Sequence, residues 1–422
     1  MPIETDQVVL NRYMNWADTH LSKLNDLHSQ MLALRQTGLQ LISDVISKEI
    51  AQNKISDQQE KRILFDHNWL MEFATGDIVK CLGPEFGIYQ GRRSPRIPNG
   101  DLLLMSRIIE IQGSRGHFEQ PSMISAELDI APDAWFYSGT LNGELPLSIL
   151  LEIALQPCGV LSAWLGTQLK SPDVDYFFRN LDGQVVFLRN IDIRGQTIQT
   201  NATLLRTVFS GSTIIQHFQF EMKCAGEVFF KGTSSFGYFP DETMATQAGL
   251  DGGKRSQPWG KSLENISKIG QFNFDSEPQN IGLPDGKLRL IDGVGIMKVG
   301  GIHSQGYVMA ERDNNPKDWF YINHFFQDPV MPGSLGIEAI VQAFKSAIHM
   351  FSDSKKPVTL APGVELEWKY RGQVLPNNHR MLLEIHVEDQ VKKAGLTLFT
   401  GSANLWADDL RIYEIHNLAF LQ

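Results

Sequence analysis

This chain has few cysteines, no excess of basic residues and no long apolar run, and each shortage excludes a class of protein. Its three cysteines, Cys81, Cys158 and Cys224, are odd in number and far apart, unlike a disulfide framework or a zinc site. Acidic residues outnumber basic ones by 48 to 38, and the formal net charge of −10 argues against general nucleic-acid binding. No uninterrupted apolar stretch of about 18 residues marks a membrane span.

The N-terminus also has little of what a signal peptide needs. Residues 1–6 are acidic and lack an apolar core. With cysteines that form no evident pairs, this favours a reducing, cytoplasmic location. What is present is ordinary for a soluble protein, with 42% apolar and 20% charged residues. At 422 residues, the chain is long enough for two or more domains with substantial cores.

Two segments are predicted to lie outside the main domains. Residues 1–60 have leucines and a methionine at three- and four-residue spacing, which predicts an amphipathic helical segment. We expect it to pack on the next domain or to link to a larger polypeptide, with an irregular dimerising coiled coil as the alternative. Residues 241–282 are rich in Gly, Ser, Asp, Asn and Pro and are predicted to be a linker.

The rest of the sequence repeats itself. The triplet Trp-Phe-Tyr at 135–137 recurs at 319–321, an offset of 319 − 135 = 184. Each triplet follows a strand-like segment and precedes a proline and an apolar helix that contains Glu-x-x-x-Gln. Other residues repeat as well. Glu152 and Gln156 correspond to Glu338 and Gln342, and Arg-Gly-Gln at 194–196 recurs at 371–373.

Strand, helix and then a run of strands therefore occur twice, which predicts an α+β fold with an antiparallel sheet in each copy. Both helices are apolar nearly all round, so we expect each to be buried in the curve of its sheet. This divides the chain into a first copy at 61–240 and a second at 283–422. Later strands are predicted at 185–193, 198–208, 213–222, 364–370, 381–387 and 396–405.

The most informative stretch is 324–338, which reads His-Phe-Phe-Gln-Asp-Pro-Val-Met-Pro-Gly-Ser-Leu-Gly-Ile-Glu. Its Pro-Gly corner is predicted to start a buried helix over 335–350. The N–H groups of a first helical turn attract a negatively charged oxygen. A histidine, a carboxylate and such an oxyanion-binding helix start together are the groups needed for chemistry next to a carbonyl.

This motif resembles the active-site motif of the beta-hydroxyacyl-carrier-protein dehydratases, which have the hot-dog fold. One departure is Gln327, where the bacterial fatty-acid enzymes usually have Gly. The tandem, together with 86–89, 96–101 and 151–159, is similar to the paired dehydratase regions of polyunsaturated-fatty-acid synthases and related bacterial secondary-lipid synthases, over roughly residues 65–420. The resemblance implies a double hot-dog fold.

His324 is the predicted base, because the pKa of imidazole lies near neutrality. In dimeric relatives the acid comes from the neighbouring hot dog, so we pair His324 with Glu152, whose pKa burial should raise. Gly333 and Ser334 are expected to supply oxyanion N–H groups, and Ser334 need not use its side chain.

Two more residues complete the expected site. The resemblance implies that the Val330 carbonyl orients the imidazole, and Gln156 lies one turn beyond the acid and is expected to bond it or the substrate. The converse site, Glu338 with Thr140 at the histidine position, lacks a base and should be inactive.

The resemblance implies dehydration of 3-hydroxyacyl thioesters to trans-2-enoyl thioesters, with double-bond isomerisation left open. The substrate would be carried on the phosphopantetheine of an acyl carrier protein, and other synthase domains would be partners. No cofactor is expected, and no metal-ligand spacing is evident. The alternatives are a non-catalytic acyl-binding or assembly module and an acyl thioesterase. The sequence leaves open a monomeric pseudo-dimer or a homodimer, and the length and stereochemistry of the acyl chain.

Overall fold

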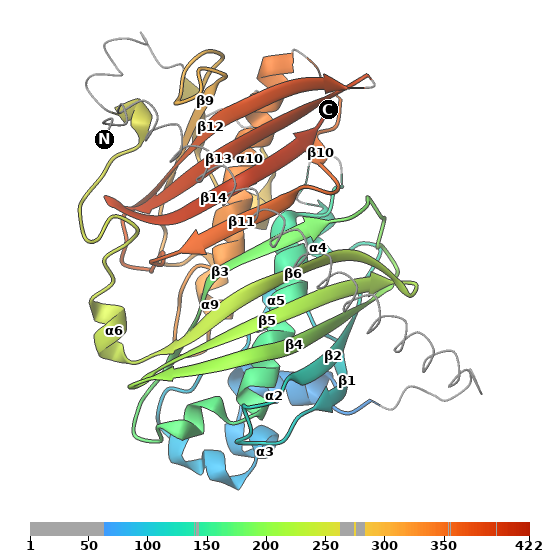
Figure 1. Cartoon of the computed structure of the whole chain (residues 1–422), viewed down its shortest axis with the longest axis vertical. Helices are drawn as coiled ribbons and strands as arrows, with labels where there is room; N and C mark the ends of the chain where they lie inside the picture. The colour runs from blue at the N-terminus through green and yellow to red at the C-terminus, as the bar shows by residue number, and fades with distance from the viewer. Residues whose placement is uncertain are drawn as a thin grey trace, which may run out of the picture. The chain divides into compact units, whose positions relative to one another are not determined.

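The structure is a computed structural model that describes residues 63–138, 140, 143–261, 274–275, 283–352, 354, 356–393 and 395–422. These residues belong to one compact unit, Ile63–Gln422 (Figure 1). The predicted N-terminal helical segment, 1–60, lies outside the described residues, as does most of 262–282. The structure therefore bears on the two repeated copies and on the first half of the predicted linker.

The first copy begins with short helices and then follows the predicted order of strand, helix and strands. Its leading elements are α2 (His67–Thr75), α3 (Ile78–Leu82), η1 (Pro84–Tyr89) and η2 (Gly100–Leu102). Its strands are β1 (Arg107–Gln112), β2 (Ser122–Asp129), β3 (Phe177–Phe187), β4 (Thr197–Ser210), β5 (Thr213–Cys224) and β6 (Glu227–Phe239). Its remaining helices are α4 (Trp135–Ser138), α5 (Leu147–Trp164) and η3 (Thr167–Lys170).

The second copy has the same order. Its helices are η5 (Gly286–Leu288), α9 (Trp319–Asn323) and α10 (Gly333–Ser352). Its strands are β8 (Gly293–Met297), β9 (Tyr307–Asp313), β10 (Thr359–Leu360), β11 (Glu365–Tyr370), β12 (Arg380–Lys393), β13 (Leu396–Ala407) and β14 (Leu410–Leu421). The connection contributes α6 (Asp241–Ala245), η4 (Trp259–Lys261) and β7 (Phe274–Asp275).

All of these strands form one antiparallel sheet, which has fourteen strands among the described residues. The order is β1-β2-β4-β5-β6-β3 in the first copy and β8-β9-β12-β13-β14-β11 in the second, so the two copies have the same topology. They meet where β3 pairs with β11, from Val186 opposite Glu365 to Asp182 opposite Lys369. Each copy is a helix held in a curved sheet, and the predicted double hot-dog α+β fold is confirmed.

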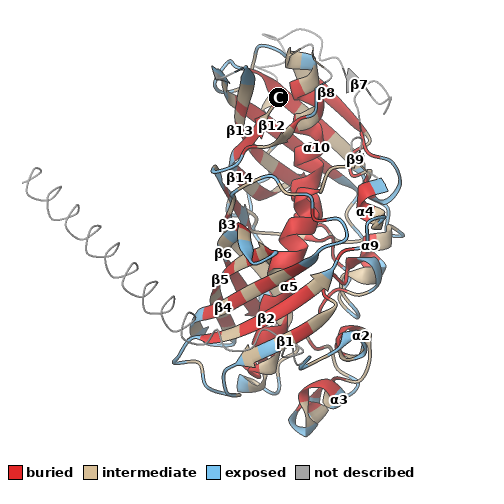
Figure 2. Cartoon of the chain, turned by 90° about the vertical axis from the view of Figure 1, so that its right-hand side faces the viewer, coloured by how far each residue is buried: buried red, intermediate tan, exposed pale blue. Residues whose placement is uncertain are grey.

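The helices α5 and α10 are the cores of the two copies, and Figure 2 shows both as almost entirely buried. The segment Leu147–Lys170 is long and apolar enough to cross a membrane by length and composition alone. However, 83% of its most apolar window is buried inside the protein, as is usual for the core helix of a folded domain. The apolar composition of α5 is therefore explained by the sheet that surrounds it.

The repeated Trp-Phe-Tyr triplets lie against each other at the contact between the copies. The rings of Trp135 and Trp319 meet edge to face with their centroids 5.2 Å apart. Their indole N–H groups donate to equivalent carbonyls, that of Asp101 at 3.2 Å and that of Lys287 at 3.0 Å. A repeat that contacts itself in this way indicates that the two copies are related by an approximate two-fold axis.

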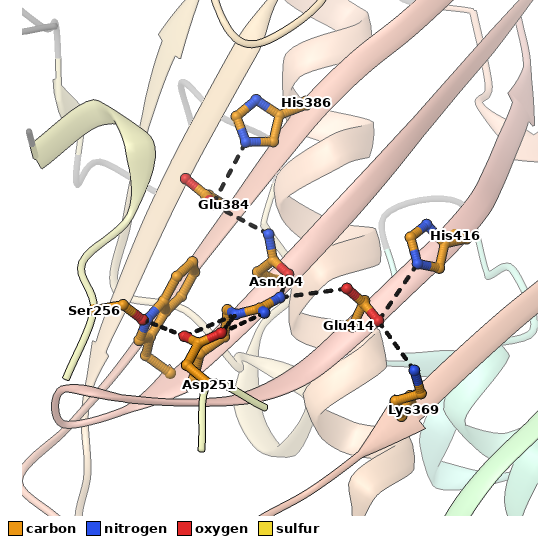
Figure 3. Close-up of polar contacts among 10 residues, drawn as sticks. Asp251, Ser256, Lys369, Glu384, His386, Asn404, Glu414 and His416 are labelled. Atoms are coloured by element: carbon orange, nitrogen blue, oxygen red, sulfur yellow. Dashed lines mark hydrogen bonds and ion pairs between the residues drawn. The ribbon is translucent and has the colours of Figure 1, made fainter. Parts of the chain in front are cut away.

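Residues 241–261, which we name the strap, begin at an ion pair between Asp241 and Arg93 of the first copy and contact the second copy from Gly249 onward. The Asp251 carboxylate pairs with Arg411 of β14, with a shortest N–O distance of 2.6 Å, and accepts from the Ser256 hydroxyl at 2.7 Å (Figure 3). Gly249 has φ +63°, and a Cβ there would lie 2.7 Å from the Arg411 carbonyl oxygen. The first half of the predicted linker is thus an ordered part of the fold.

Candidate active site between the two copies

One cavity of about 370 Å³ contains all six of the residues selected from the sequence. The second copy contributes His324, Val330, Gly333 and Ser334, and the first contributes Glu152 and Gln156. The cavity size is typical of small-ligand sites. The structure therefore brings together a histidine and a carboxylic acid that are 172 positions apart (324 − 152 = 172).

His324 directly follows α9 and is fixed by its backbone and its ring. Its N–H donates to Phe320 O at 2.9 Å, its carbonyl accepts from the Val330 N–H at 2.8 Å, and its Nδ1 lies 2.9 Å from Val330 O. A carbonyl oxygen can only accept, so Nδ1 carries the hydrogen and Nε2 is the basic nitrogen. Burial, more than any other influence, lowers the pKa of His324 to about 3.

Arg179 holds the loop after the histidine, and sequence reasoning missed it. Its guanidinium reaches from β3 of the first copy and binds both carboxylate oxygens of Asp328, each at 2.6 Å. The two side chains are only 12% and 13% exposed. Its Nε also donates to Gln373 at 2.8 Å. The carboxylate inside the motif was the available signal, because a mostly buried carboxylate requires a partner.

Gln327 lies in the left-handed region of this loop, with φ +63°. Glycine adopts this conformation without the steric penalty that a side chain brings, which is roughly 1–2 kcal/mol per residue. Gln327, which stands where the bacterial enzymes usually have Gly, therefore lies at a position whose backbone conformation favours Gly. The chain retains the loop geometry because the neighbouring Asp328 is anchored by Arg179.

Glu152 faces the start of the opposite helix and is 8% exposed. Its Oε1 accepts from the Ser334 hydroxyl at 2.6 Å, and its Oε2 accepts from the Gln156 amide at 2.9 Å. Burial is the largest influence on this carboxyl and raises its pKa, and the two hydrogen bonds oppose that rise. Ser334 thus uses its side chain, where the sequence had indicated only a need for its backbone.

The glutamine of Glu-x-x-x-Gln has the same structural role in both copies. The Gln156 amide donates to Leu102 O at 2.7 Å and accepts from the Leu104 N–H at 2.9 Å. Gln342 makes the matching pair of bonds in the second copy, to Leu288 O and from the Leu290 N–H. Gln156 also donates to the Glu152 carboxyl, one of the two partners expected for it. Its bonds to a neighbouring loop are repeated by Gln342, so the glutamine of each Glu-x-x-x-Gln braces a loop.

Gly333 begins α10 and allows the close approach of an aromatic ring. A Cβ at this position would lie 2.6 Å from the ring of Tyr370, so no side chain fits without a shift. The first N–H groups of a helix have no intrahelical acceptor. Gly333 and Ser334 both line the cavity, and the free N–H groups of a first helical turn can bind a negatively charged oxygen.

The converse pair consists of Glu338 and of Thr140, which stands at the histidine position. Glu338 Oε2 accepts from the Ser148 N–H at 3.0 Å, and burial raises the pKa of this carboxyl. Thr140, at the histidine position, has its hydroxyl 3.1 Å from the carbonyl oxygens of Tyr137 and Glu144. The two halves of the protein are thus alike in fold but differ in the side chain at the position of His324.

The Pro-Cys sequence inside α5 has a structural explanation. Pro157 lacks the N–H that would bond the carbonyl of Ile153, and the Thr200 hydroxyl lies 3.4 Å from that carbonyl oxygen. Cys158 is completely buried, and burial raises the pKa of its thiol, as expected for a small core residue. Within the described part of the chain, no group of three or more His, Cys, Asp or Glu is placed to hold a metal.

The fold and the cavity define a tandem hot-dog protein with a histidine and a glutamate in one site. A family model described as a FabA-like domain matches residues 97–232 and 283–416, one segment in each copy. The chain therefore belongs to the FabA-like domain family.

One curated relative is a subunit of the polyunsaturated fatty acid synthase of Thraustochytrium sp., which is 35% identical over 382 residues. The match covers 83% of this chain and 25% of the relative, so the chain spans about a quarter of that protein's length. The relative's own activity and assembly therefore inform a proposal and do not assign a function.

Two solved structures are similar to the chain at low identity. The dehydratase domain from the CurK module of curacin polyketide synthase is 15% identical, with a TM-score of 0.40 and coverage of 76% of this chain and 98% of that domain. A protein described as an oleoyl thioesterase, from Lactobacillus plantarum, is 11% identical, with a TM-score of 0.42 and coverage of 72% and 96%. Neither likeness is close enough to indicate an activity.

Proposed function

We propose that this protein removes water from 3-hydroxyacyl thioesters to give trans-2-enoyl thioesters. The observation that carries the proposal is the shared cavity of His324 and Glu152, in which burial favours a neutral imidazole and a protonated carboxyl. An elimination next to a carbonyl needs this combination of a free base and a protonated acid. Membership of the FabA-like family supports the assignment.

In the proposed reaction, His324 Nε2 accepts the proton from C2 of the substrate. As the C2–H bond breaks, its electron pair forms the C2–C3 double bond and negative charge builds on the thioester oxygen. The N–H groups of Gly333 and Ser334 stabilise that charge, a contribution of about 100- to 1,000-fold for one donor in comparable sites. The neutral state of the imidazole is essential, because a protonated ring has no lone pair to accept with.

Glu152 completes the elimination at C3. Its proton passes to the C3 hydroxyl, the C3–O bond breaks, and water leaves. Ser334 and Gln156 hold the two carboxyl oxygens and so fix the direction in which the acid faces. Solvent then takes the proton from His324 and returns one to Glu152. The elimination requires no redox step, so the proposal includes no cofactor.

The wider setting is part of the same proposal. Similarity to a fatty acid synthase subunit suggests that the acyl chain belongs to a lipid synthase, where an acyl carrier protein would present it on a phosphopantetheine arm. Other synthase domains would then be partners, and the location would be cytoplasmic. Isomerisation of the double bond after dehydration would use the same base and acid.

The proposal is tested with 3-hydroxyacyl pantetheine thioesters, by following enoyl absorbance and release of free thiol. We expect enoyl formation by the wild type and a loss of at least about 100-fold in His324→Ala. His379→Ala, which changes a histidine away from the cavity, is the matched control and should retain activity. Thiol release without enoyl absorbance would indicate a thioesterase and would contradict the proposal.

A further inference from the structure

Beyond the acid, α5 presents a narrow strip to the cavity. Every residue from Leu147 to Ala163 is buried except Leu155 and Gly159, and both of these line the cavity. They lie three and seven positions after Glu152, so all three are on the same face of the helix. A bound molecule that passes the acid along α5 therefore meets first a leucine and then a glycine.

The walls beside this strip are apolar. A Cβ on Gly159 would lie 3.5 Å from the ring of Phe178, and Phe178 is stacked on Phe236 with centroids 5.1 Å apart. Arg96 also lines the cavity, but its Nη1 donates to backbone carbonyls at 2.9 and 3.1 Å. An alkyl chain is favourably buried on such a surface.

A second part of the lining is polar, and three of its residues come from the strap. It suits the amide groups of a carrier arm, which need hydrogen-bonding partners when they leave water. Its residues are Asn180, Thr243, Thr246, Gln247 and Gln373. The lining thus includes both apolar and polar side chains, as the two halves of an acyl-pantetheine molecule require, with the reacting groups also on the cavity wall.

In the second copy, a long side chain stands at the helix position that corresponds to Gly159. The helices align with an offset of 338 − 152 = 186, which places Lys345 at the position of Gly159. The Lys345 side chain forms an ion pair with Glu144, and its ammonium lies 5.8 Å from the ring centroid of Phe420. A long side chain therefore occupies the helix face that is bare in the first copy.

We propose that the strip Leu155–Gly159 is the surface on which the acyl chain lies, and that the missing side chain at Gly159 sets the chain length accepted. The inference rests on the proposed dehydration. Gly159 is 159 − 152 = 7 residues beyond the acid, about 10 Å along the helix. A saturated chain advances roughly 1.25 Å per carbon, so about eight carbons span that distance. The substrates are thus medium- and long-chain 3-hydroxyacyl thioesters.

The test compares a short and a long substrate in variants of the strip. Gly159→Leu should keep kcat/KM for 3-hydroxybutyryl pantetheine within about three-fold, and should lower it at least about ten-fold for the 3-hydroxydodecanoyl thioester. Gly159→Ala is the matched control, because its Cβ makes an ordinary contact and fits. Turnover of the short substrate reports that each variant is folded.

Leu155→Phe is a second variant that narrows the strip one turn nearer the acid. This variant should lower kcat/KM for shorter acyl chains as well, including 3-hydroxyoctanoyl pantetheine. Losses that are equal for all lengths in both variants, or absent in both, overturn the inference and leave the proposed dehydration standing. Failure of the wild type to dehydrate any length overturns both.

Discussion

The sharpest prediction compares two buried glutamates that are equivalent in the repeat. We expect Glu152→Gln to lower kcat/KM for dehydration by about 100- to 10,000-fold, the usual contribution of a general acid. That range corresponds to roughly 3–5 kcal/mol of transition-state stabilisation. Glu338→Gln, made at the same position of the other helix, should leave kcat/KM within about three-fold.

Both substitutions should leave the protein folded, which makes the comparison fair. In Glu338→Gln, the amide oxygen can still accept the Ser148 N–H. In Glu152→Gln, one oxygen is kept, and the Ser334 hydroxyl can turn to accept from the new amide. We expect each change to alter the free energy of unfolding by about 1 kcal/mol, the size of one rearranged hydrogen bond.

The assay is steady-state enoyl absorbance over a range of pH, with urea unfolding of each variant. Glu152 must be protonated to act, and burial raises its pKa, so the wild-type rate should fall as pH rises through that raised value. Glu152→Gln should lose this alkaline limb from its residual rate. Inactivity of Glu338→Gln together with full activity of Glu152→Gln would refute the pairing across the copies.

Three further predictions concern His324, the start of α10 and the loop that Arg179 anchors. Because burial lowers the pKa of His324 to about 3, kcat/KM should not fall from pH 7 to pH 5, whereas an unperturbed histidine would lose roughly 25-fold in a pH-rate profile. Gly333→Ala should lower kcat about 100-fold, because its Cβ meets a tyrosine ring, while Gly87→Ala, in open space, should not. Arg179→Lys should lose the two-oxygen contact with Asp328 and about 1–3 kcal/mol of stability in urea unfolding, with kcat lowered; unchanged stability would contradict the anchoring role.

Periodicity and the repeat predicted much of the fold. The strands expected at 213–222 and 396–405 correspond to β5 and β13, and the apolar run at 335–350 lies within α10. These elements are regular because each alternates or recurs with one buried face. The boundaries differ by a few residues at their ends, where burial no longer constrains the pattern.

Other elements could not be predicted in this way. The strand expected at 185–193 overlaps only the end of β3, which begins at Phe177 and carries Arg179, Asn180 and Asp182 in its first half. Arg179 and Asn180 line the cavity and Asp182 lies at the junction with β11, so these positions do not follow the alternation of a strand on a simple core. The strands β6 and β14 were not predicted.

The candidate site shows the same limit. The motif and the repeat selected six residues that the structure places in one cavity, because a repeated sequence implies a repeated geometry. The Arg179–Asp328 pair and the Ser334–Glu152 bond join positions 149 and 182 residues apart. Such contacts depend on how the two copies meet, and a single sequence has no local pattern that records it.

The joining of β3 to β11 within one polypeptide has a further consequence. Subunits of a homodimer share one gene, so every substitution appears on both sides of the symmetry axis. A covalent pair is free of that constraint, and its halves also cannot separate on dilution. A mutation in one half therefore leaves the other half unchanged, and the halves differ where a threonine aligns with His324 and a lysine with Gly159.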